Sequence, residues 1–391
     1  MRPQEIRKDF PILQENPGLA YLDNAATSQK PREVIRRLET FYTEENSNVG
    51  RGVYDLASTA TQVYEDSRQT IAEFIGANKD EIVFVRNTTE AENLLAESMD
   101  VEGEVVLSEM AHHSEQLPWR RATGSSDNFS FIDTEDGRLS VDSAEKEIGQ
   151  DTDVVVISHV SNVFGVENPV EEITEIAHEN GAKVILDAAQ SVPHTSVDVK
   201  ELEVEFLTFS GHKMVGPTGI GVLYGKKQEL EELGPYQIGG GMVQSVEKRS
   251  VSYTQPPQRF EAGTPNIAGA AGMAEAARYL QDVGMDEIEA HDRKLCERIR
   301  EGLTGIEGLE VVSPQGAVLV SFETDFAHPH DVAQVLDERD VAVRAGNHCA
   351  QPQMREINTN GTTRASPYLY NTEEDVERLI EAVKEAKELF S

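Results

Sequence analysis

Short apolar runs rich in β-branched residues alternate with amphipathic stretches between residues 80 and 225. The runs, which we predict to be strands, cover residues 81–85, 104–107, 154–157, 184–186, 206–209 and 219–224. Between them, residues 90–99 and 170–180 carry apolar side chains at helical spacing, and Gly181 is suited to end the second helix. Nearly continuous apolar strands that alternate with helices predict an α/β fold, with a mostly parallel sheet covered on both faces.

Beyond about residue 268 the pattern indicates a second, smaller unit. Helices are expected at 268–283, 285–303 and 373–390, and strands at 318–322, 341–344 and 364–369. This order of elements favours an α+β domain, with a boundary between residues 268 and 285. Ligands of open α/β sheets bind beyond the carboxyl ends of the strands, so the chemistry is expected at those positions of the larger domain.

The composition narrows the choice of partners. The 391 residues include 70 acidic and 35 basic side chains, which gives a formal net charge of −35. A surface this acidic repels phosphate backbones and anionic lipids, so neither nucleic acid nor a membrane is expected as a partner. No apolar run approaches the roughly 20 residues of a membrane span. We predict a cytoplasmic protein, and we interpret the charge as adaptation to a salty cell interior, where self-repulsion is screened.

The two cysteines differ in their surroundings. Cys296 lies in a helical stretch and is predicted to be a small buried apolar residue. Cys349 lies in a polar loop beside His348 and near Arg344, where it is equally well read as a reactive thiol or as a bystander. Two cysteines exclude a disulfide framework and a zinc site of the CxxC type, and no metal is expected.

Polar residues follow several of the predicted strands. Thr88 and Thr89 precede a helix, where they suit either a phosphate or a simple helix cap. Asp187 and Lys213 each end an apolar strand, and the lysine is either solvent-directed or an amine nucleophile. Together they match the needs of pyridoxal phosphate, because a lysine forms the Schiff base and an aspartate keeps the pyridine nitrogen protonated. Arg364 suits a carboxylate ligand or a surface ion pair.

Longer motifs run from one end of the chain to the other. They are found at residues 6–13, 21–27, 86–90, 161–163, 209–224, 260–266, 344–352 and 370–372. In this order they resemble the type II cysteine desulfurases of the SUF iron–sulfur system, within the class V aminotransferase group of fold-type I pyridoxal-phosphate enzymes. The short 344–352 loop is similar to the type II form. The resemblance implies a seven-stranded sheet in a large domain over 16–275, and a small domain formed by 1–15 and 276–391.

The resemblance also implies roles for single residues around the cofactor. Lys213 forms the Schiff base, Asp187 pairs with the pyridine nitrogen and Gln190 with the ring hydroxyl. His112 stacks on the ring and assists proton transfer. The implied phosphate ligands are Thr88, Thr89, Ser210, His212 and, from the other subunit of a homodimer, Thr264.

For the substrate, the resemblance implies that Arg364 binds the carboxylate of L-cysteine and that Asn162 lies near this carboxylate and the cofactor hydroxyl. Cys349 takes the sulfur as a persulfide and leaves alanine. The sulfur then passes to an acceptor protein of the SUF system and to a cluster scaffold. The alternative is a selenocysteine lyase or another class V enzyme, an aminotransferase or epimerase, which shares Lys213 and Asp187 but does not need Cys349.

Overall fold

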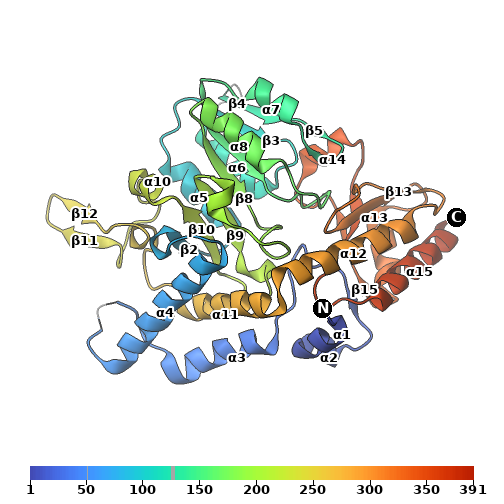
Figure 1. The fold of residues 1–391 in the computed structure, drawn as a ribbon, viewed down its shortest axis with the longest axis horizontal. Helices are drawn as coiled ribbons and strands as arrows, with labels where there is room; N and C mark the ends of the chain where they lie inside the picture. The colour runs from blue at the N-terminus through green and yellow to red at the C-terminus, as the bar shows by residue number, and fades with distance from the viewer. Residues whose placement is uncertain (51, 125–127) are drawn as a thin grey trace.

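A seven-stranded sheet forms the centre of the larger part of the molecule in the computed structural model, which describes residues 1–50, 52–124 and 128–391 (Figure 1). Its spatial order is β2-β10-β9-β8-β7-β3-β4, and only β10 runs antiparallel to its neighbours. The strands are β2 Ile82–Val85, β3 Glu104–Ser108, β4 Phe129–Ile132, β7 Thr152–Ser158, β8 Lys183–Asp187, β9 Phe206–Ser210 and β10 Gly221–Gly225. The mostly parallel sheet is therefore confirmed.

The strand that the sequence pattern missed is β4, at the edge of the sheet. It pairs with β3 alone, and only Ile132 of its four residues is buried. An edge strand that is covered on one side needs no continuous apolar run, so its pattern is weak.

Helices cover both faces of the sheet because alternate strand residues face opposite sides. Ile82 and Phe84 belong to one apolar cluster, and Val83 and Val85 belong to another. The first cluster includes α4 Asp55–Phe74, α7 Val141–Glu147, α8 Val170–Glu179 and α11 Ile267–Val283. The second includes α5 Thr88–Ser98, α6 His113–Ala122 and α10 Lys227–Glu232. Gly181 follows α8 with a positive φ of 84°, as expected of a residue that ends a helix.

The C-terminal part has a core of its own around a four-stranded antiparallel sheet. The sheet order is β13 Leu309–Val311, β14 Val320–Thr324, β17 Thr362–Ala365 and β16 Arg344–Gly346. Its helices are α12 Met285–Leu303, α13 Pro329–Asp337, α14 Gln351–Glu356 and α15 Glu373–Phe390. Cys296 of α12 is buried in the apolar cluster of this part, which confirms its prediction as a core residue.

All three strand predictions in this part were wrong in their limits. The expected strand 318–322 is β14, which lies two residues later in the chain. The expected strand 341–344 is divided into β15 Val341–Ala342 and β16, which pair with different partners. β15 lies parallel to β1 Ala20–Tyr21, from the other end of the chain. The expected strand 364–369 begins earlier, at Thr362, and ends at Ala365. A turn closed by the Asn371 amide on the Tyr368 carbonyl then leads into α15.

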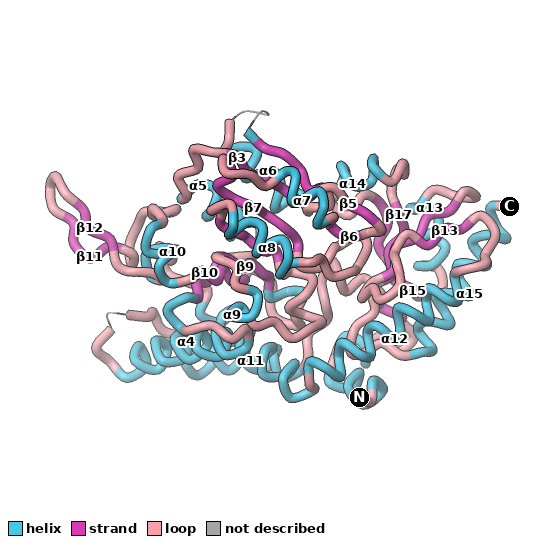
Figure 2. The backbone as a smooth tube through the Cα atoms, turned by 45° about the horizontal axis from the view of Figure 1, so that its top comes forward, coloured by secondary structure: helices cyan, strands magenta, loops and turns pink. Residues whose placement is uncertain are grey.

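The two parts are joined along one side by α11 and α12, which follow one another in the chain (Figures 1 and 2). A hairpin of β11 Val243–Val246 and β12 Val251–Tyr253 projects from the opposite end of the larger part (Figure 2). The remaining short elements are α1 Pro3–Ile6, α2 Pro11–Glu15, α3 Arg32–Thr40, β5 Thr134–Glu135, β6 Arg138–Leu139 and α9 Val199–Leu202. No helix among the described residues is both long and apolar enough to cross a membrane.

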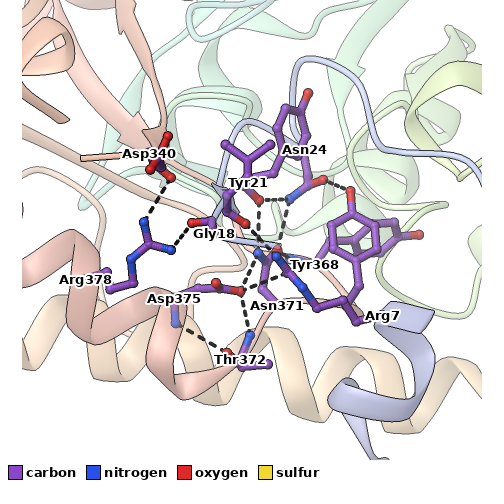
Figure 3. Close-up of polar contacts among 12 residues, drawn as sticks. Arg7, Gly18, Tyr21, Asn24, Asp340, Tyr368, Asn371, Thr372, Asp375 and Arg378 are labelled. Carbon is purple, nitrogen blue, oxygen red and sulfur yellow. Dashed lines mark hydrogen bonds and ion pairs between the residues drawn. The ribbon is translucent and has the colours of Figure 1, made fainter. Parts of the chain in front are cut away.

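Polar contacts hold the N-terminal segment against the start of α15 (Figure 3). The side chain of Asn371 is fully buried and donates to the Tyr21 carbonyl and to Asp375, at 3.0 and 3.1 Å. Its oxygen accepts from the Tyr368 amide at 2.9 Å and from Asn24 at 3.2 Å. The motifs at residues 21–27 and 370–372 therefore meet in space, and this junction fixes the loop that leads to Ala25 at the cavity described next.

Candidate active site

The polar residues after the parallel strands line one cavity of about 210 Å³, together with residues of the C-terminal part. Every site residue predicted from the sequence is in its wall except Thr264. The wall includes Thr88, Thr89, His112, Asn162, Asp187, Gln190, Ser210, His212, Lys213, Cys349 and Arg364. Thr264 lies in a different cavity with Tyr54, Tyr64 and Arg68, and its role in another subunit stays a prediction.

One end of the cavity is suited to a phosphate group. Asn87, not a threonine, caps α5 by accepting the Glu90 amide at 3.0 Å, so the reading of Thr88 as a simple cap is wrong. Thr88 instead contacts Ser210, whose hydroxyl lies 2.9 Å from the Thr88 amide and 3.0 Å from its hydroxyl. The hydroxyls of Thr88, Thr89 and Ser210 thus gather at the N-terminus of an eleven-residue helix, where an anion is favoured.

This close approach depends on a residue without a side chain. Gly221 begins β10 between the ends of β2 and β9. A Cβ atom at this position would lie 2.8 Å from the Asn87 Cα and 2.8 Å from the Phe209 carbonyl oxygen. Any other residue would therefore push Thr88 and Ser210 apart.

Lys213 and Asp187 face the same cavity from the ends of β9 and β8. Lys213 lies in a short 3₁₀ turn directly after β9 and lines the cavity wall, so it is not an outward-directed surface lysine. Burial lowers the pKa of Lys213, although the carboxylate of Asp187 opposes this shift. A lowered pKa leaves more of the amine uncharged and able to attack a carbonyl carbon.

His112 caps α6 from the cavity side. Its Nδ1 accepts the Ser114 amide at 3.1 Å and lies 2.7 Å from the Ser114 hydroxyl. These bonds assign the hydrogen of the neutral ring to Nε2. Burial, together with the positive charge of Lys213, lowers the pKa of His112 to about 3, so the ring is neutral at ordinary pH.

Arg364 is buried in the cavity wall, with 2% of its surface exposed, so the alternative of a surface ion pair is wrong. Its Nη1 donates to the Asn162 carbonyl at 2.8 Å, and its Nη2 lies 3.6 Å from Asp23 Oδ1. Burial lowers the pKa of Arg364 to about 10, and Asp23 opposes the shift. Its Nε is buried without a hydrogen-bond partner. This orphaned donor suits a carboxylate ligand.

The loop that carries Cys349 reaches the cavity from the C-terminal part. His348 and Cys349 have φ values of 48° and 56°, in the left-handed region that non-glycine residues seldom adopt. The His113 amide donates to the Cys349 carbonyl at 2.8 Å, and Asn162 Nδ2 donates to the His348 carbonyl at 2.7 Å. The backbone is therefore held at two points while the Cys349 side chain remains exposed at the cavity.

The wall fits pyridoxal phosphate in its chemistry. It combines an amine of lowered pKa, a carboxylate on the neighbouring strand and hydroxyls at a helix N-terminus. The buried guanidinium with a free donor is suited to the carboxylate of an amino acid. These groups come from separate elements, and each has the hydrogen-bonding character that one part of the cofactor or substrate requires.

Other wall residues were missed by the sequence reasoning. Glu115, Ser158, Ser114 and Arg344 line the cavity. Glu115 lies shortly after the histidine pair, and no local signal in the sequence marked it. In the structure it caps the N-terminus of α6. Asp23, which orients Arg364, lies within a motif that the sequence reasoning used only for the resemblance.

Comparisons with known proteins agree with this architecture. A profile of the family described as Aminotransferase class-V matches residues 20–379. A probable cysteine desulfurase of Halalkalibacterium halodurans is 47% identical, over 100% of this chain and 99% of that protein. The apo structure of cysteine desulfurase from Thermococcus onnurineus NA1 has a TM-score of 0.94 and 42% identity, covering 100% of this chain and 98% of that one. The S-sulfonic acid structure of the cysteine desulfurase CsdA from Escherichia coli has a TM-score of 0.93 and 34% identity, covering 100% of both chains.

Proposed function

Because the chain belongs to the cysteine desulfurases of the class-V aminotransferase family, we propose that it removes sulfur from L-cysteine with Lys213 and Cys349 as the two reacting residues. One observation carries the assignment of these residues. The amine of Lys213, from the sheet, and the thiol of Cys349, from the C-terminal part, line the same cavity. An aminotransferase or epimerase of the same family needs the amine but not the thiol.

The overall reaction balances with one cysteine and one enzyme thiol. The Cys349 thiolate attacks the sulfur of the substrate, so a new S–S bond forms and the C–S bond breaks. The electron pair of the broken bond stays with the carbon, which takes up a proton to give alanine. Pyridoxal phosphate, when bound, supplies the electron sink that this bond cleavage needs.

The chain's own residues divide the remaining tasks. Lys213 would hold the cofactor covalently, Asp187 would hold its pyridine nitrogen, and Gln190 would lie near its ring hydroxyl. Thr88, Thr89, Ser210 and His212 would bind the phosphate. The neutral ring of His112, with its hydrogen on Nε2, would stack on the cofactor and assist proton transfer. Arg364 binds the substrate carboxylate. The Arg364 guanidinium is itself held by a hydrogen bond to the main-chain carbonyl of Asn162.

The partners follow from the reach of the thiol. Hydrogen bonds hold the backbone of the Cys349 loop at both His348 and Cys349, so a persulfide on Cys349 moves little. A sulfur acceptor must therefore bind close to the cavity. We propose a dedicated acceptor protein of the SUF system, which delivers the sulfur to a cluster scaffold in the cytoplasm. We also propose a homodimer in which Thr264 reaches the phosphate of the other subunit, because Thr264 is exposed in a cavity away from its own site.

The proposed function is tested by assaying alanine and sulfide from L-cysteine with the purified, yellow, borohydride-reducible holoenzyme. Equal amounts of the two products support the proposal when a thiol reductant is present. The same assay with selenocysteine distinguishes the alternative of a selenocysteine lyase, which would show turnover of the selenium substrate alone. Absence of alanine from L-cysteine would contradict the proposal.

Replacing Arg364 by alanine is expected to raise the KM for L-cysteine by about 10- to 150-fold. A charge-assisted hydrogen bond is worth about 1.5–3 kcal/mol, and each 1.4 kcal/mol is about a tenfold change in binding. Steady-state kinetics measure the effect. Arg339→Ala, which removes an exposed arginine paired with Glu385, is the matched control and is expected to keep the normal KM. A normal KM in Arg364→Ala would rule out its role as carboxylate ligand.

Raising the salt concentration is expected to stabilise the protein. The net charge of −35 produces self-repulsion in dilute buffer, and molar salt shortens the Debye length to about 3 Å. We therefore predict that the Tm rises by several degrees between low and molar potassium chloride, as measured by differential scanning fluorimetry. A Tm that stays constant or falls would refute the proposed salt adaptation.

A further inference from the structure

Three carboxyl groups lie buried together beside the cavity. Asp187 ends β8, Glu115 lies in the first turn of α6 and Glu92 lies in α5, with exposed fractions of 7%, 1% and 0%. Several described groups shift the pKa values of these three carboxyls. Among the strongest of them, Lys213 is the one basic side chain. Carboxylates this close cannot all be ionised without a matching positive charge, so at least one of them carries a proton.

Glu115 contacts several residues of the cavity wall. One of its oxygens accepts the backbone amide of His112 at 2.9 Å. The hydroxyl of Ser158 lies 3.0 and 2.8 Å from its two oxygens. Ser158 and Asp187 are direct neighbours across β7 and β8, and the Glu115 carboxyl also forms a side-chain hydrogen bond with Asp187.

A hydrogen bond between two carboxyl groups requires one shared proton, and the contacts decide which group carries it. Asp187 also accepts the Ala189 amide at 2.8 Å and faces the Lys213 amine. Burial raises the pKa of Asp187, but Lys213, the Ala189 amide and the Glu115 hydrogen bond all act against this rise. For Glu115, burial raises the pKa well above its ordinary range, and the charges of Asp187 and Glu92 raise it further.

Glu92 is the third member and is not itself part of the cavity wall. It accepts the Trp119 indole N–H at 3.0 Å and the Thr208 hydroxyl at 3.1 Å. Thr208 lies beside Asp187 across β8 and β9. Its bond to Glu92 therefore connects α5 to the strand position next to Asp187. Burial raises the pKa of Glu92 to about 8, with Asp187 contributing in the same direction.

We propose that Glu115 is a positioning residue that carries a proton in the folded enzyme and donates it in a hydrogen bond to Asp187. In this state it keeps Asp187 anionic and oriented toward the pyridine nitrogen of the cofactor. Through its bond to the His112 amide, the same side chain also fixes His112 in the cavity wall. The link to the cofactor rests on the proposed function, whereas the protonation of Glu115 does not.

The protonated state is tested directly by infrared difference spectroscopy of the full-length holoenzyme near neutral pH. We expect Glu115→Gln to remove the carbonyl band of a neutral carboxylic acid. Loss of a carboxylate band instead would overturn the proposal. If Glu115→Gln does not fold, Glu92→Gln decides instead, because it removes the other buried glutamate of raised pKa. A neutral carboxylic-acid band that remains in this variant supports the proposal, and its absence would overturn it.

The pH dependence of stability gives a second readout. The groups that face Glu115 are Asp187 from β8, Glu92 from α5, Lys213 after β9 and the neutral His112 of its own helix. With its pKa raised by folding, Glu115 binds a proton in the folded state that the unfolded chain has released above about pH 4.3. The wild type therefore loses stability as pH rises above this value, whereas glutamine at position 115 does not titrate.

We expect the unfolding equilibrium constant of the wild type, relative to Glu115→Gln, to rise by about tenfold per pH unit between pH 5 and 7. Glu97→Gln, which neutralises an exposed acid on α5, is the control. Its unfolding equilibrium constant is expected to change with pH as that of the wild type does. If the ratio of the wild-type unfolding constant to that of Glu115→Gln does not change with pH, a protonated Glu115 is refuted.

The positioning role has its own signature in the bound cofactor. Glutamine can still donate to Asp187 and accept from the His112 amide, so Glu115→Gln is expected to keep the visible spectrum and the affinity for pyridoxal phosphate within about twofold. Glu115→Ala removes both contacts and is expected to weaken cofactor binding by about tenfold or more. This is the change in affinity that the loss of one charge-assisted hydrogen bond causes. Equal cofactor affinity in the alanine variant and the wild type would refute the positioning role. None of these measurements uses turnover, so they can fail while the desulfuration assay succeeds, or the reverse.

Discussion

Replacing Lys213 by alanine is expected to give a colourless protein with no measurable production of alanine from L-cysteine. The side chain is the one amine in the cavity wall among the described residues, and burial lowers its pKa toward the uncharged form. Without it the cofactor has no covalent anchor. We expect activity to fall by about 10³-fold or more, as is usual when a covalent catalytic group is removed. Absorption spectroscopy and an alanine assay measure the two losses.

Lys200→Ala is the control for this variant. Lys200 is an exposed lysine of α9, away from the cavity, so colour and activity should both be retained. A coloured, borohydride-reducible Lys213→Ala protein would show that another amine holds the cofactor. This outcome would remove the basis of the whole site assignment.

Replacing Cys349 by serine is expected to separate the two halves of the reaction. Serine has nearly the same size and suits the same strained backbone, but its hydroxyl cannot take sulfur to form a persulfide. The variant should therefore remain yellow and bind L-cysteine, while alanine production falls by about 10³-fold or more. The comparison of spectrum and product assay in one sample shows whether cofactor binding and sulfur transfer depend on different residues.

Cys296→Ala is the matched control because Cys296 is the other cysteine of the chain. It is buried in the core of the C-terminal part, so its loss should lower stability slightly and leave the persulfide-forming activity intact. Unchanged desulfuration in Cys349→Ser would contradict the assignment of the nucleophile. Loss of activity in Cys296→Ala with retained folding would contradict it as well.

The sheet and the long helices were predictable because their patterns are strong and local. The predicted ends of α12 and α15 agree with the structure, and the apolar runs of the six central strands needed no tertiary information. The edge strand β4 escaped because a half-covered strand has a mixed pattern. The division of 341–344 into two strands escaped because it depends on pairing with β1, more than 300 residues away in the chain.

The part of the candidate site that could be predicted consists of polar residues placed directly after apolar strands. Asp187 and Lys213 have this position, and the sequence reasoning found them without the fold. Arg364 was ambiguous, because only its burial beside Asp23 and Asn162 distinguishes a ligand from a surface ion pair. Glu115 was not identified, because its partner Ser158 and its neighbour Asp187 come from strands distant in sequence.

The persulfide itself offers the most direct test of the central proposal, that the thiol of the C-terminal part receives the sulfur of a substrate held by the sheet. The holoenzyme is incubated with a limiting amount of L-cysteine, alkylated and mapped by peptide mass spectrometry. We predict that the peptide containing Cys349 gains the mass of one sulfur atom, that the peptide containing Cys296 does not, and that one alanine appears for each sulfur bound. Sulfur on Cys296 alone, or alanine without sulfur on Cys349, would contradict the account.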